Sequence, residues 1–173
     1  MKISVAAILI AIFLFSCGND KKSSTDQDQT TTYYFIRHSE KDRSDSDNRN
    51  PNLNEMGQQR AASWATYFDS IDLDMVYATD YNRTQQTAAP TADSKDLAIM
   101  SYDPSAMYDE GFKAATQGKT VLVVGHSNTT PAFVNAVLGA RTYEDIDDNE
   151  NGMLYIVKVT NEGATATEKK IGN

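Results

Sequence analysis

Thr120-Val121-Leu122-Val123-Val124 is the strongest strand signal in the chain, and it runs directly into Gly125 and His126. Its apolar residues follow one another without the alternation of a half-exposed strand, which indicates a strand buried on both faces. Such strands are typical of parallel sheets that helices cover on both sides. The stretch therefore predicts an α/β domain built around a mainly parallel sheet.

Segments with strand and helix patterns alternate along the rest of the chain. Strands are predicted at residues 33–36, 75–78, 97–101 and 153–159, the last of them at an edge of the sheet. Helices are predicted at residues 55–68, 82–89, 105–116 and 130–138. Asn54 is expected to cap the first helix, and Pro90 to end the second. The alternation predicts a three-layer sandwich with helices on both faces of the central sheet.

Length and composition fit one folded domain with an acidic surface. The chain has 173 residues, of which 40% are hydrophobic and 23% charged, and its formal net charge is −8. This length supports one core rather than two. Because an acidic surface repels polyanions at long range, we expect no nucleic-acid partner, and an anionic substrate would need a local basic pocket.

The N-terminal residues resemble a bacterial export signal. A positive start at Met1-Lys2 precedes an almost entirely apolar run from Ile3 to Phe15, which is too short to span a bilayer as a helix. Cys17, the only cysteine, follows this run at the position where bacterial lipoproteins carry their lipid. We therefore expect residues 1–16 to be removed and Cys17 to anchor an exported protein to a cell-envelope membrane, on its periplasmic or surface side. An ordinary signal peptide is the alternative.

The polar stretch after Cys17 predicts a tether. Gly18 to Thr32 contains no apolar residue that could dock on a core, so residues 17–32 are interpreted as a flexible linker. The folded domain is expected over residues 33–160, and residues 161–173 are expected to form a C-terminal strand or tail.

Arginine and histidine side chains follow the predicted strands. Arg37-His38 comes directly after the strand at 33–36, His126 follows the apolar run at 120–124, and Arg83 lies just beyond the strand at 75–78. Sites in parallel sheets form beyond the carboxyl ends of the strands. The chain has two histidines, and both occupy such positions. We therefore expect these four side chains to meet in one site.

Two imidazoles and two guanidinium groups can together catalyse phosphoryl transfer. Arginine binds phosphoryl oxygens bidentately and keeps its charge. A neutral imidazole can attack phosphorus once a hydrogen bond fixes its tautomer, and a second imidazole can stabilise the charge of the transition state. Because the sequence has no clustered set of His, Asp and Glu ligands, we expect no metal and no cofactor.

Four stretches around these residues resemble, in order, the motifs of the histidine phosphatase superfamily, which includes phosphoglycerate mutases, acid phosphatases and small phosphohistidine phosphatases. They are Arg37-His38-Ser39-Glu40, Leu53 to Ala61, Val76 to Ala88, and Val123 to Asn128. Ser39 in place of the family's glycine and Arg60 in place of its glutamine are departures. The resemblance covers Tyr33 to about Val159 and implies a phosphoglycerate mutase-like fold.

The resemblance also implies a role for each residue of the site. His38 would attack phosphorus and become a phosphohistidine, while Arg37 and Arg83 would hold the phosphoryl oxygens. His126 would donate a hydrogen bond to the transferring group, and water would hydrolyse the intermediate. Asn128 would either contribute to the same pocket or cap the helix predicted at 130–138.

The acid that protonates the leaving group is the part of the mechanism that the sequence leaves open. Family members often carry it after the third strand, so Asp103 is the candidate, with Asp109 and Glu110 next along the chain. Glu40, which lies two residues after His38, is a further candidate for this acid, and a structural role is the alternative for it. A phosphoramidate substrate, which has a nitrogen leaving group, would not need such an acid.

The short connection between Arg83 and His126 predicts an open pocket. An open pocket suits a phosphorylated protein side chain or a small phosphomonoester better than it suits a mutase, which must shield its phosphohistidine from water. We therefore expect a phosphatase for phosphomonoesters or phosphoramidates. The alternatives are a catalytically weak lipoprotein module that binds a phosphorylated ligand, and a phosphoglycerate-type mutase.

Overall fold

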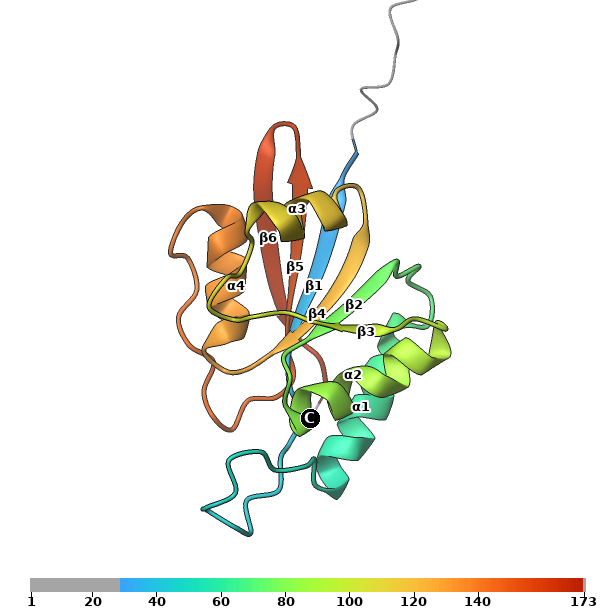
Figure 1. Cartoon of the computed structure of the whole chain (residues 1–173), viewed down its shortest axis with the longest axis vertical. Helices are drawn as coiled ribbons and strands as arrows, with labels where there is room; N and C mark the ends of the chain where they lie inside the picture. The colour runs from blue at the N-terminus through green and yellow to red at the C-terminus, as the bar shows by residue number, and fades with distance from the viewer. Residues whose placement is uncertain (1–28, 173) are drawn as a thin grey trace, which may run out of the picture.

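The computed structural model describes residues 29–172 (Figure 1). The strands are β1 (Thr31–Arg37), β2 (Met75–Ala78), β3 (Ile99–Ser101), β4 (Thr120–Gly125), β5 (Met153–Thr160) and β6 (Gly163–Lys170). The helices are α1 (Glu55–Phe68), α2 (Asn82–Ser94), α3 (Glu110–Thr116) and α4 (Thr129–Leu138). The predicted signal, Cys17 and most of the predicted tether lie outside the described residues. Within residues 29–172, no helix has both the length and the apolar character needed to cross a membrane.

The strands form one six-stranded sheet in the order β3-β2-β4-β1-β5-β6 (Figure 1). β3, β2, β4 and β1 run parallel, whereas β5 pairs antiparallel with β1 and β6 antiparallel with β5. The apolar run at residues 120–124 lies in β4, between β1 and β2. The predicted mainly parallel sheet is confirmed.

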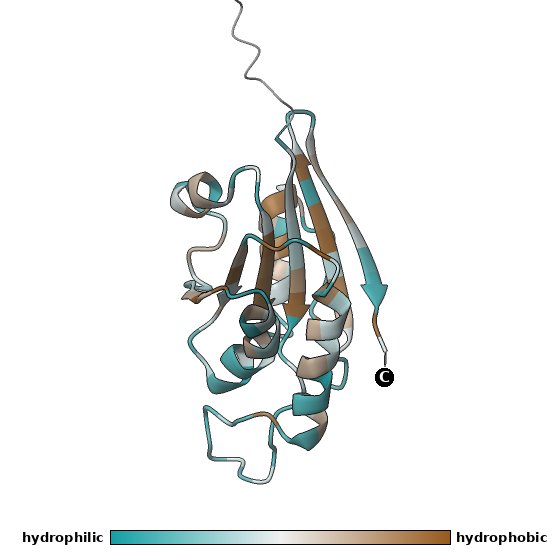
Figure 2. Cartoon of the chain, turned by 90° about the vertical axis from the view of Figure 1, so that its right-hand side faces the viewer, coloured by the Kyte–Doolittle hydropathy of each residue, from teal (hydrophilic) through white to brown (hydrophobic). Residues whose placement is uncertain are grey.

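Each face of the sheet has its own hydrophobic core, because side chains of successive strand residues point to opposite faces. Val121 and Val123 of β4 pack with α3 and α4, whereas Leu122 and Val124 pack with α1 and α2. Figure 2 shows the most hydrophobic colouring along the central strands, between these helical layers. The uninterrupted apolar run of β4 thus reflects burial on both faces, and the three-layer architecture is confirmed.

The borders of the sheet differ from the prediction, although β6 falls within residues 161–173, which were expected to form a strand or a tail. β5 was expected at an edge, but that is wrong because β6 pairs along its outer side. β6 covers residues 163–170, so the sheet extends past the predicted domain end at residue 160. β1 begins at Thr31, inside the predicted tether, and the Thr31 side chain accepts a hydrogen bond from the Gly118 backbone N–H at 2.8 Å. A polar segment can therefore join the sheet when backbone pairing stabilises it.

Two helices differ from their predicted bounds for local reasons. α2 continues through Pro90 to Ser94, although proline cannot donate the usual backbone hydrogen bond. Burial of Ala88 and Ala92 against the sheet favours the continuation. α3 is shorter than predicted and starts at Glu110, where the Asp109 side chain accepts a hydrogen bond from the Phe112 backbone N–H at 2.7 Å.

The start of α1 is fixed against the segment that follows β1. The Asn54 side chain accepts a hydrogen bond from the Gly57 backbone N–H at 2.8 Å, so the predicted cap is confirmed. A Cβ atom at Gly57 would lie 2.1 Å from the Glu40 carbonyl oxygen. Glycine is therefore required at this position, because it lets α1 approach the backbone two residues after His38.

Candidate active site

The carboxyl ends of β1 and β4 bring the two histidines together. These strands are parallel neighbours in which Arg37 is paired with Gly125, so His38 and His126 leave the sheet at the same level. Their ring centroids are 5.4 Å apart, with the ring planes inclined by 68°. The expected meeting of the two rings is therefore present in the structure.

A pocket of about 340 Å³ lies at these strand ends. It is lined by Arg37, His38, Lys41, Tyr81, Arg83, Pro104, His126, Ser127, Asn128, Thr129 and Asp148. The structure thus gathers all four of the arginines and histidines predicted for the site. Asn128 lines the pocket and makes no side-chain cap for α4, so its position agrees with the first of its two predicted roles.

His38 is held as a neutral imidazole with one defined tautomer. Its Nδ1 atom lies 2.7 Å from the Ser39 carbonyl oxygen, which can only accept, so Nδ1 carries the proton. Burial is the main reason that the pKa of His38 is lowered to about 3; the charge on Arg37 acts in the same direction, and the hydrogen bond to the Ser39 carbonyl acts in the opposite one. At neutral pH the Nε2 atom therefore has a lone pair available for attack on an electrophile.

Backbone contacts on both sides of His38 fix the ring's position. The His38 N–H donates to the Gly125 carbonyl at 2.9 Å, and the His38 carbonyl accepts from the Asn151 amide at 2.8 Å. The Ser39 N–H donates to the Thr87 hydroxyl at 2.9 Å. The nucleophile candidate is thus tied to β4, to α2 and to the loop before β5.

His126 is oriented by a buried pair of threonines. Its Nε2 atom lies 2.9 Å from the hydroxyl oxygen of Thr79, which is 3.0 Å from the hydroxyl oxygen of Thr84. The Thr84 hydroxyl in turn donates to backbone carbonyl oxygens. This arrangement points the other ring nitrogen, Nδ1, towards Arg83 Nη2 at 3.4 Å.

The ring of His126 is also neutral in this state. Burial lowers its pKa to about 4, and the charges of Arg83 and Arg37 contribute to the same effect. A phosphoryl dianion next to these arginines would offset their charge and raise the pKa of His126. Its Nδ1 atom could then carry a proton and donate to a phosphoryl oxygen.

The two site arginines have different environments. Arg37 is buried, and its Nη1 atom donates to the carbonyl oxygens of Asp147 and Glu150 at 2.8 and 2.9 Å. Arg83 lies with its guanidinium carbon 4.4 Å from the ring centroid of Tyr81. The Nε atom of Arg37 and the Nε and Nη1 atoms of Arg83 are buried donors without a protein partner. An anion in the pocket would supply the acceptors that such donors need.

Asp103 does not line the pocket, contrary to its predicted role as general acid. Its exposed carboxylate accepts hydrogen bonds from the Ser105 backbone N–H at 2.8 Å and the Ser105 hydroxyl at 2.7 Å. These hydrogen bonds lower the pKa of Asp103. The neighbouring Pro104 reaches the pocket instead, because the turn closed by Asp103 directs the carboxylate away.

The other acids considered from the sequence have structural partners. Asp109 caps α3, and the Glu110 carboxylate is 2.7 Å from Lys113 Nζ. Glu40 forms an ion pair with Arg60 at 2.7 Å. Arg60, the departure from the family motif, thus supplies the cation that holds Glu40, and a structural role accounts for both residues.

Asp148 is the carboxylate that lines the pocket among the described residues. Its two oxygens lie 2.7 Å from Arg37 Nη2 and 2.7 Å from Arg43 Nη2. Partial burial raises the pKa of Asp148, but the hydrogen bonds from Arg43 and Arg37 outweigh burial, so the net pKa is lowered. A carboxylate held in this way is a poor proton donor at neutral pH.

Three residues of the site were not singled out by sequence reasoning. Thr79 directly follows β2, so the rule that pointed to the other strand exits would also have found it. Lys41 lies four residues beyond the end of β1 in a mixed charge run. Asp148 lies in an irregular loop before β5, and no local pattern predicts that this loop returns to Arg37. Residues 29–172 contain no group of three or more His, Cys, Asp or Glu side chains placed to hold a metal ion.

Comparisons with known proteins agree with this fold. The family model described as histidine phosphatase superfamily (branch 1) matches residues 33–104. No sequence match was found among curated proteins. The protein histidine phosphatase SixA complexed with tungstate is similar in structure, with a TM-score of 0.65 and 14% identity over 80% of this chain and 96% of that chain.

Two further solved structures show the same likeness. A protein assigned as the phosphohistidine phosphatase SixA of Agrobacterium tumefaciens has a TM-score of 0.57 and 18% identity, over 83% of this chain and 98% of that chain. Mycobacterial glucosyl-3-phosphoglycerate phosphatase has a TM-score of 0.58 and 11% identity, over 82% of this chain and 98% of that chain. At such identities the likeness shows the fold alone. The family model matches residues 33–104, less than half of the chain, so over this range the chain is similar to the histidine phosphatase superfamily (branch 1), and its fold is similar to that of solved phosphatases.

Proposed function

We propose that this protein hydrolyses phosphomonoesters or phosphoramidates through a phosphohistidine on His38, without a metal ion. The observation that carries the proposal is the state of His38: its Nδ1 proton is held by the Ser39 carbonyl and its ring is neutral. His38 also lies in one pocket with Arg37, Arg83 and His126. A fixed neutral imidazole beside two guanidinium groups is what attack on a phosphoryl group requires.

The reaction has two displacement steps at phosphorus. In the first step, His38 Nε2 forms a bond to phosphorus while the bond from phosphorus to the leaving oxygen or nitrogen breaks. In the second step, a water oxygen attacks phosphorus, the phosphorus–nitrogen bond to His38 breaks, and phosphate leaves. Arg37 and Arg83 hold the equatorial oxygens in both steps, and His126 donates to one of them as negative charge increases there.

The pocket favours a leaving group that departs without help from a strong acid. Asp148, its lining carboxylate, is kept ionised by two arginines, and Asp103 is directed away. Phosphoramidates and esters of acidic alcohols need little or no protonation by the enzyme. Similarity of fold to two proteins called SixA, one of them described as a protein histidine phosphatase, supports phosphohistidine as one such substrate.

Hydrolysis of para-nitrophenyl phosphate with and without a chelator tests the chemistry. We expect turnover that resists the chelator and falls by about 10³-fold or more in His38→Ala. Acid-labile, alkali-stable phosphate should label the wild-type protein during turnover. Sensitivity to the chelator, or an active His38→Ala variant, would contradict the mechanism. Binding of inorganic phosphate without any turnover would support the binding-module alternative instead.

The preference for leaving groups needs a separate measurement. We expect kcat/KM for a phosphohistidine peptide to exceed that for glycerol phosphate by about 10²-fold or more, because an alkoxide leaves poorly without a general acid. Equal values for both substrates would mean that the pocket supplies an acid, and the preference proposed here would be wrong.

We also propose, from the sequence alone, that the chain is exported and lipid-anchored through Cys17. The apolar run before Cys17 and the polar stretch after it support the proposal. Metabolic labelling with a fatty acid should mark the wild-type protein and not Cys17→Ser, and only the wild type should sediment with membranes. Labelling of the Cys17→Ser variant would contradict the proposal.

A further inference from the structure

A second hollow adjoins the pocket that contains His38 and His126, which is called the phosphate pocket from here on. Both hollows have Lys41 and Asp148 in their linings. The second hollow is a groove with a volume of about 250 Å³. It is lined by Glu40, Lys41, Arg43, Asn54, Met56, Asp148, Asn149 and Asn151. A substrate whose phosphoryl group lies beside His38 would therefore have room to extend into the groove past Lys41.

The pocket and the groove together carry more positive charge than one phosphoryl group needs. Their cations are Arg37, Lys41, Arg43 and Arg83. Their acids are Asp148 and Glu40, but Glu40 is already neutralised by Arg60 at 2.7 Å. Four cations against one remaining carboxylate leave three positive charges, of which a phosphoryl dianion offsets two. The whole chain has a formal net charge of −8, so the excess positive charge at the pocket and the groove is opposite in sign to that of the protein as a whole.

Lys41, like Arg83, forms no ion pair among the described residues, whereas Arg37 and Arg43 share Asp148. No carboxylate of the described residues lies within 4.0 Å of the Lys41 ammonium group. Partial burial lowers the pKa of Lys41, and the charges of Arg43 and Arg83 lower it further. An anion next to Lys41 would relieve this repulsion.

The backbone at Lys41 is held in place, so the ammonium group starts from a fixed point. Lys41 forms an isolated antiparallel bridge with Leu53, which is buried. The next residue, Asp42, donates its backbone N–H to the Asn52 carbonyl at 2.8 Å. Lys41 therefore differs from a lysine on a freely moving loop, and part of the entropy cost of ordering it has already been met.

Asp148 shows that a carboxylate fits between the pocket and the groove. Its oxygens bridge Arg37 and Arg43 at 2.7 Å each. Only the Nη2 atom of Arg43 takes part in these contacts, so the other guanidinium donors of Arg43 can still bind an acceptor. The groove, whose lining does not include His38, thus offers donors of Arg43 and Lys41.

We propose that the groove is a second anion subsite, in which Lys41, together with Arg43, binds a carboxylate or a second phosphoryl group carried by the substrate. The inference rests on the proposed function and narrows its substrate class. The preferred substrate would be a phosphorylated compound with another negative group close to the phosphoryl group, in a small acid or in an acidic peptide.

Matched substrates test the subsite during turnover. We expect wild-type kcat/KM for 3-carboxyphenyl phosphate to exceed that for phenyl phosphate by about tenfold, as one charge-assisted hydrogen bond predicts. In Lys41→Gln this ratio should fall to about one, and Lys41→Arg should restore most of it. A wild-type ratio near one, or an equal ratio in Lys41→Gln, would overturn the proposal.

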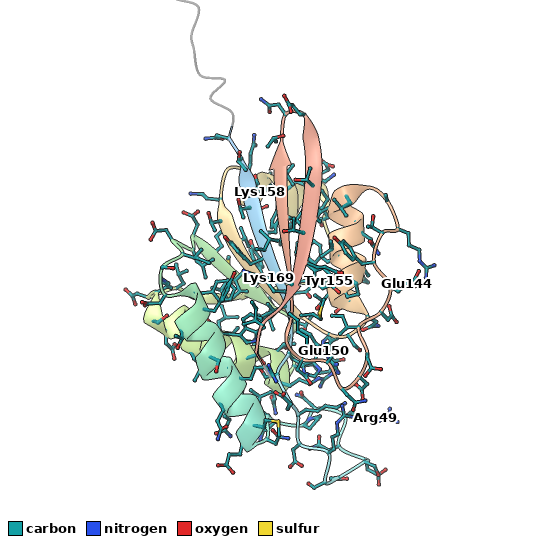
Figure 3. All side chains as sticks on the ribbon, turned by 180° about the vertical axis from the view of Figure 1, so that it is seen from behind. Arg49, Glu144, Glu150, Tyr155, Lys158 and Lys169 are labelled. Atoms are coloured by element: carbon teal, nitrogen blue, oxygen red, sulfur yellow. The ribbon has the colours of Figure 1, made fainter. Side chains whose placement is uncertain are left out.

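The control variant removes a lysine from the other end of the sheet. Lys158 of β5 is exposed and, as Figure 3 shows, lies far from the loop that carries Arg49, on the side of the molecule opposite the strand ends of the site. Lys158→Gln changes the net charge by the same amount as Lys41→Gln and should leave the tenfold ratio intact. Loss of the ratio in Lys158→Gln would point to a general charge effect and would overturn the subsite.

Binding of phosphonates separates this proposal from the proposed function. Phosphonoacetate and ethylphosphonate cannot be hydrolysed, so their dissociation constants do not depend on catalysis. We expect phosphonoacetate to bind the wild type about tenfold more tightly than ethylphosphonate, and this difference to vanish in Lys41→Gln. If no substrate is turned over and the difference is still present, the hydrolase mechanism fails and the subsite stands. An absent difference overturns the subsite even if turnover is rapid.

Peptides identify the source of the second negative group. Two phosphohistidine peptides that differ by Asp or Asn next to the phosphorylated residue form the second matched pair. A preference for the acidic member in either pair, lost in Lys41→Gln, supports the subsite, and the pair with the larger ratio identifies the source. If neither pair shows a preference for its acidic member, the excess positive charge does not select substrates, and the proposed subsite is overturned.

Discussion

The floor and the rim of the phosphate pocket differ in how their side chains are held. The floor consists of Arg37, His38, Thr79 and His126, which leave the ends of β1, β2 and β4 and bond to backbone groups or to buried hydroxyls. The rim consists of Lys41, Pro104 and Asp148, which come from loops, and of Arg43 from the adjoining groove, which forms an exposed ion pair with Asp148. In Figure 2 the loop after β1 is mostly hydrophilic, whereas the central strands that lead to the floor are hydrophobic.

This difference between floor and rim shows which part of the site is determined by the fold itself. Strand register sets the spacing of the floor residues, so the phosphoryl chemistry cannot change without changing the sheet. Rim residues depend on loops, which tolerate substitution and insertion. We therefore expect substitutions on the floor to remove activity, and substitutions on the rim to change which substrates are preferred.

Replacing Arg83, whose Nη2 atom lies 3.4 Å from Nδ1 of the floor residue His126, should have the largest effect on activity. Arg83 presents two buried donors without protein partners, and Arg83→Gln removes the charge that would bind phosphoryl oxygens. We expect kcat/KM for para-nitrophenyl phosphate to fall by about 10²- to 10³-fold. Arg141→Gln, which removes an exposed arginine paired with Glu144, serves as the control and should be neutral. A loss below about fivefold in Arg83→Gln would mean that Arg37 alone binds the phosphoryl group.

Thr79 tests whether the floor depends on orientation as well as charge. Thr79→Val keeps the shape but removes the hydroxyl next to His126 Nε2, so kcat should fall by about 10- to 100-fold with little change in KM. Thr79→Ser retains the hydroxyl and should stay within about threefold of the wild type. The two variants should also differ in the pH profile of kcat, because only valine removes a partner of the His126 proton. Equal kinetics for valine and serine would refute the orienting role.

The buried histidines should make stability depend on pH. Their pKa values are lowered to about 3 for His38 and about 4 for His126, so the unfolded chain binds protons near pH 6.5 that the folded chain does not yet bind. The free energy of unfolding should therefore fall as the pH decreases from about 6.5 to about 4.

Urea unfolding at several pH values measures this dependence. In a variant with His38→Gln and His126→Gln, the decrease over that range should be smaller than in the wild type. Carboxylates such as Asp148, whose pKa is lowered, add a loss of stability at lower pH in both proteins and cancel in the difference. A steeper decrease in the double variant would contradict the neutral state assigned to the two rings.

Asp103 should show the smallest effect. Its carboxylate closes a turn with Ser105 and does not line the pocket, so Asp103→Asn should change kcat/KM by less than about twofold. Loss of a general acid would instead lower the rate by about 10²-fold or more. A loss of that size, found with glycerol phosphate as substrate, would show that the loop carrying Asp103 moves into the pocket during turnover.

The fold and the floor of the site were largely predictable, because they depend on local patterns. The apolar run of β4 indicated burial on both faces, and the position of Arg37, His38, Arg83 and His126 just after strands indicated one site. These inferences need only the geometry of parallel strands, which is the same in many proteins.

The rim was not predictable, because long-range contacts place it. Asp148 reaches Arg37 only because the loop before β5 returns to the end of β1 and is fixed there by carbonyl contacts to the same arginine. Asp103 has the expected position in the sequence, but the turn it forms with Ser105 decides where its carboxylate points. Pro90 is a similar case, in which burial of neighbouring alanines overrides a local signal for the end of a helix.

The two edge strands of the sheet, β3 and β6, bear on whether the protein aggregates at high concentration. An unpaired outer strand is a template on which a second molecule can add its own strand, the step that starts aggregation. β3 offers only three residues for this, and the longer border at β6 ends in Glu168, Lys169 and Lys170, all exposed. Charges on the long border and brevity on the short one both discourage edge-to-edge assembly, so crowding of many copies should leave them separate.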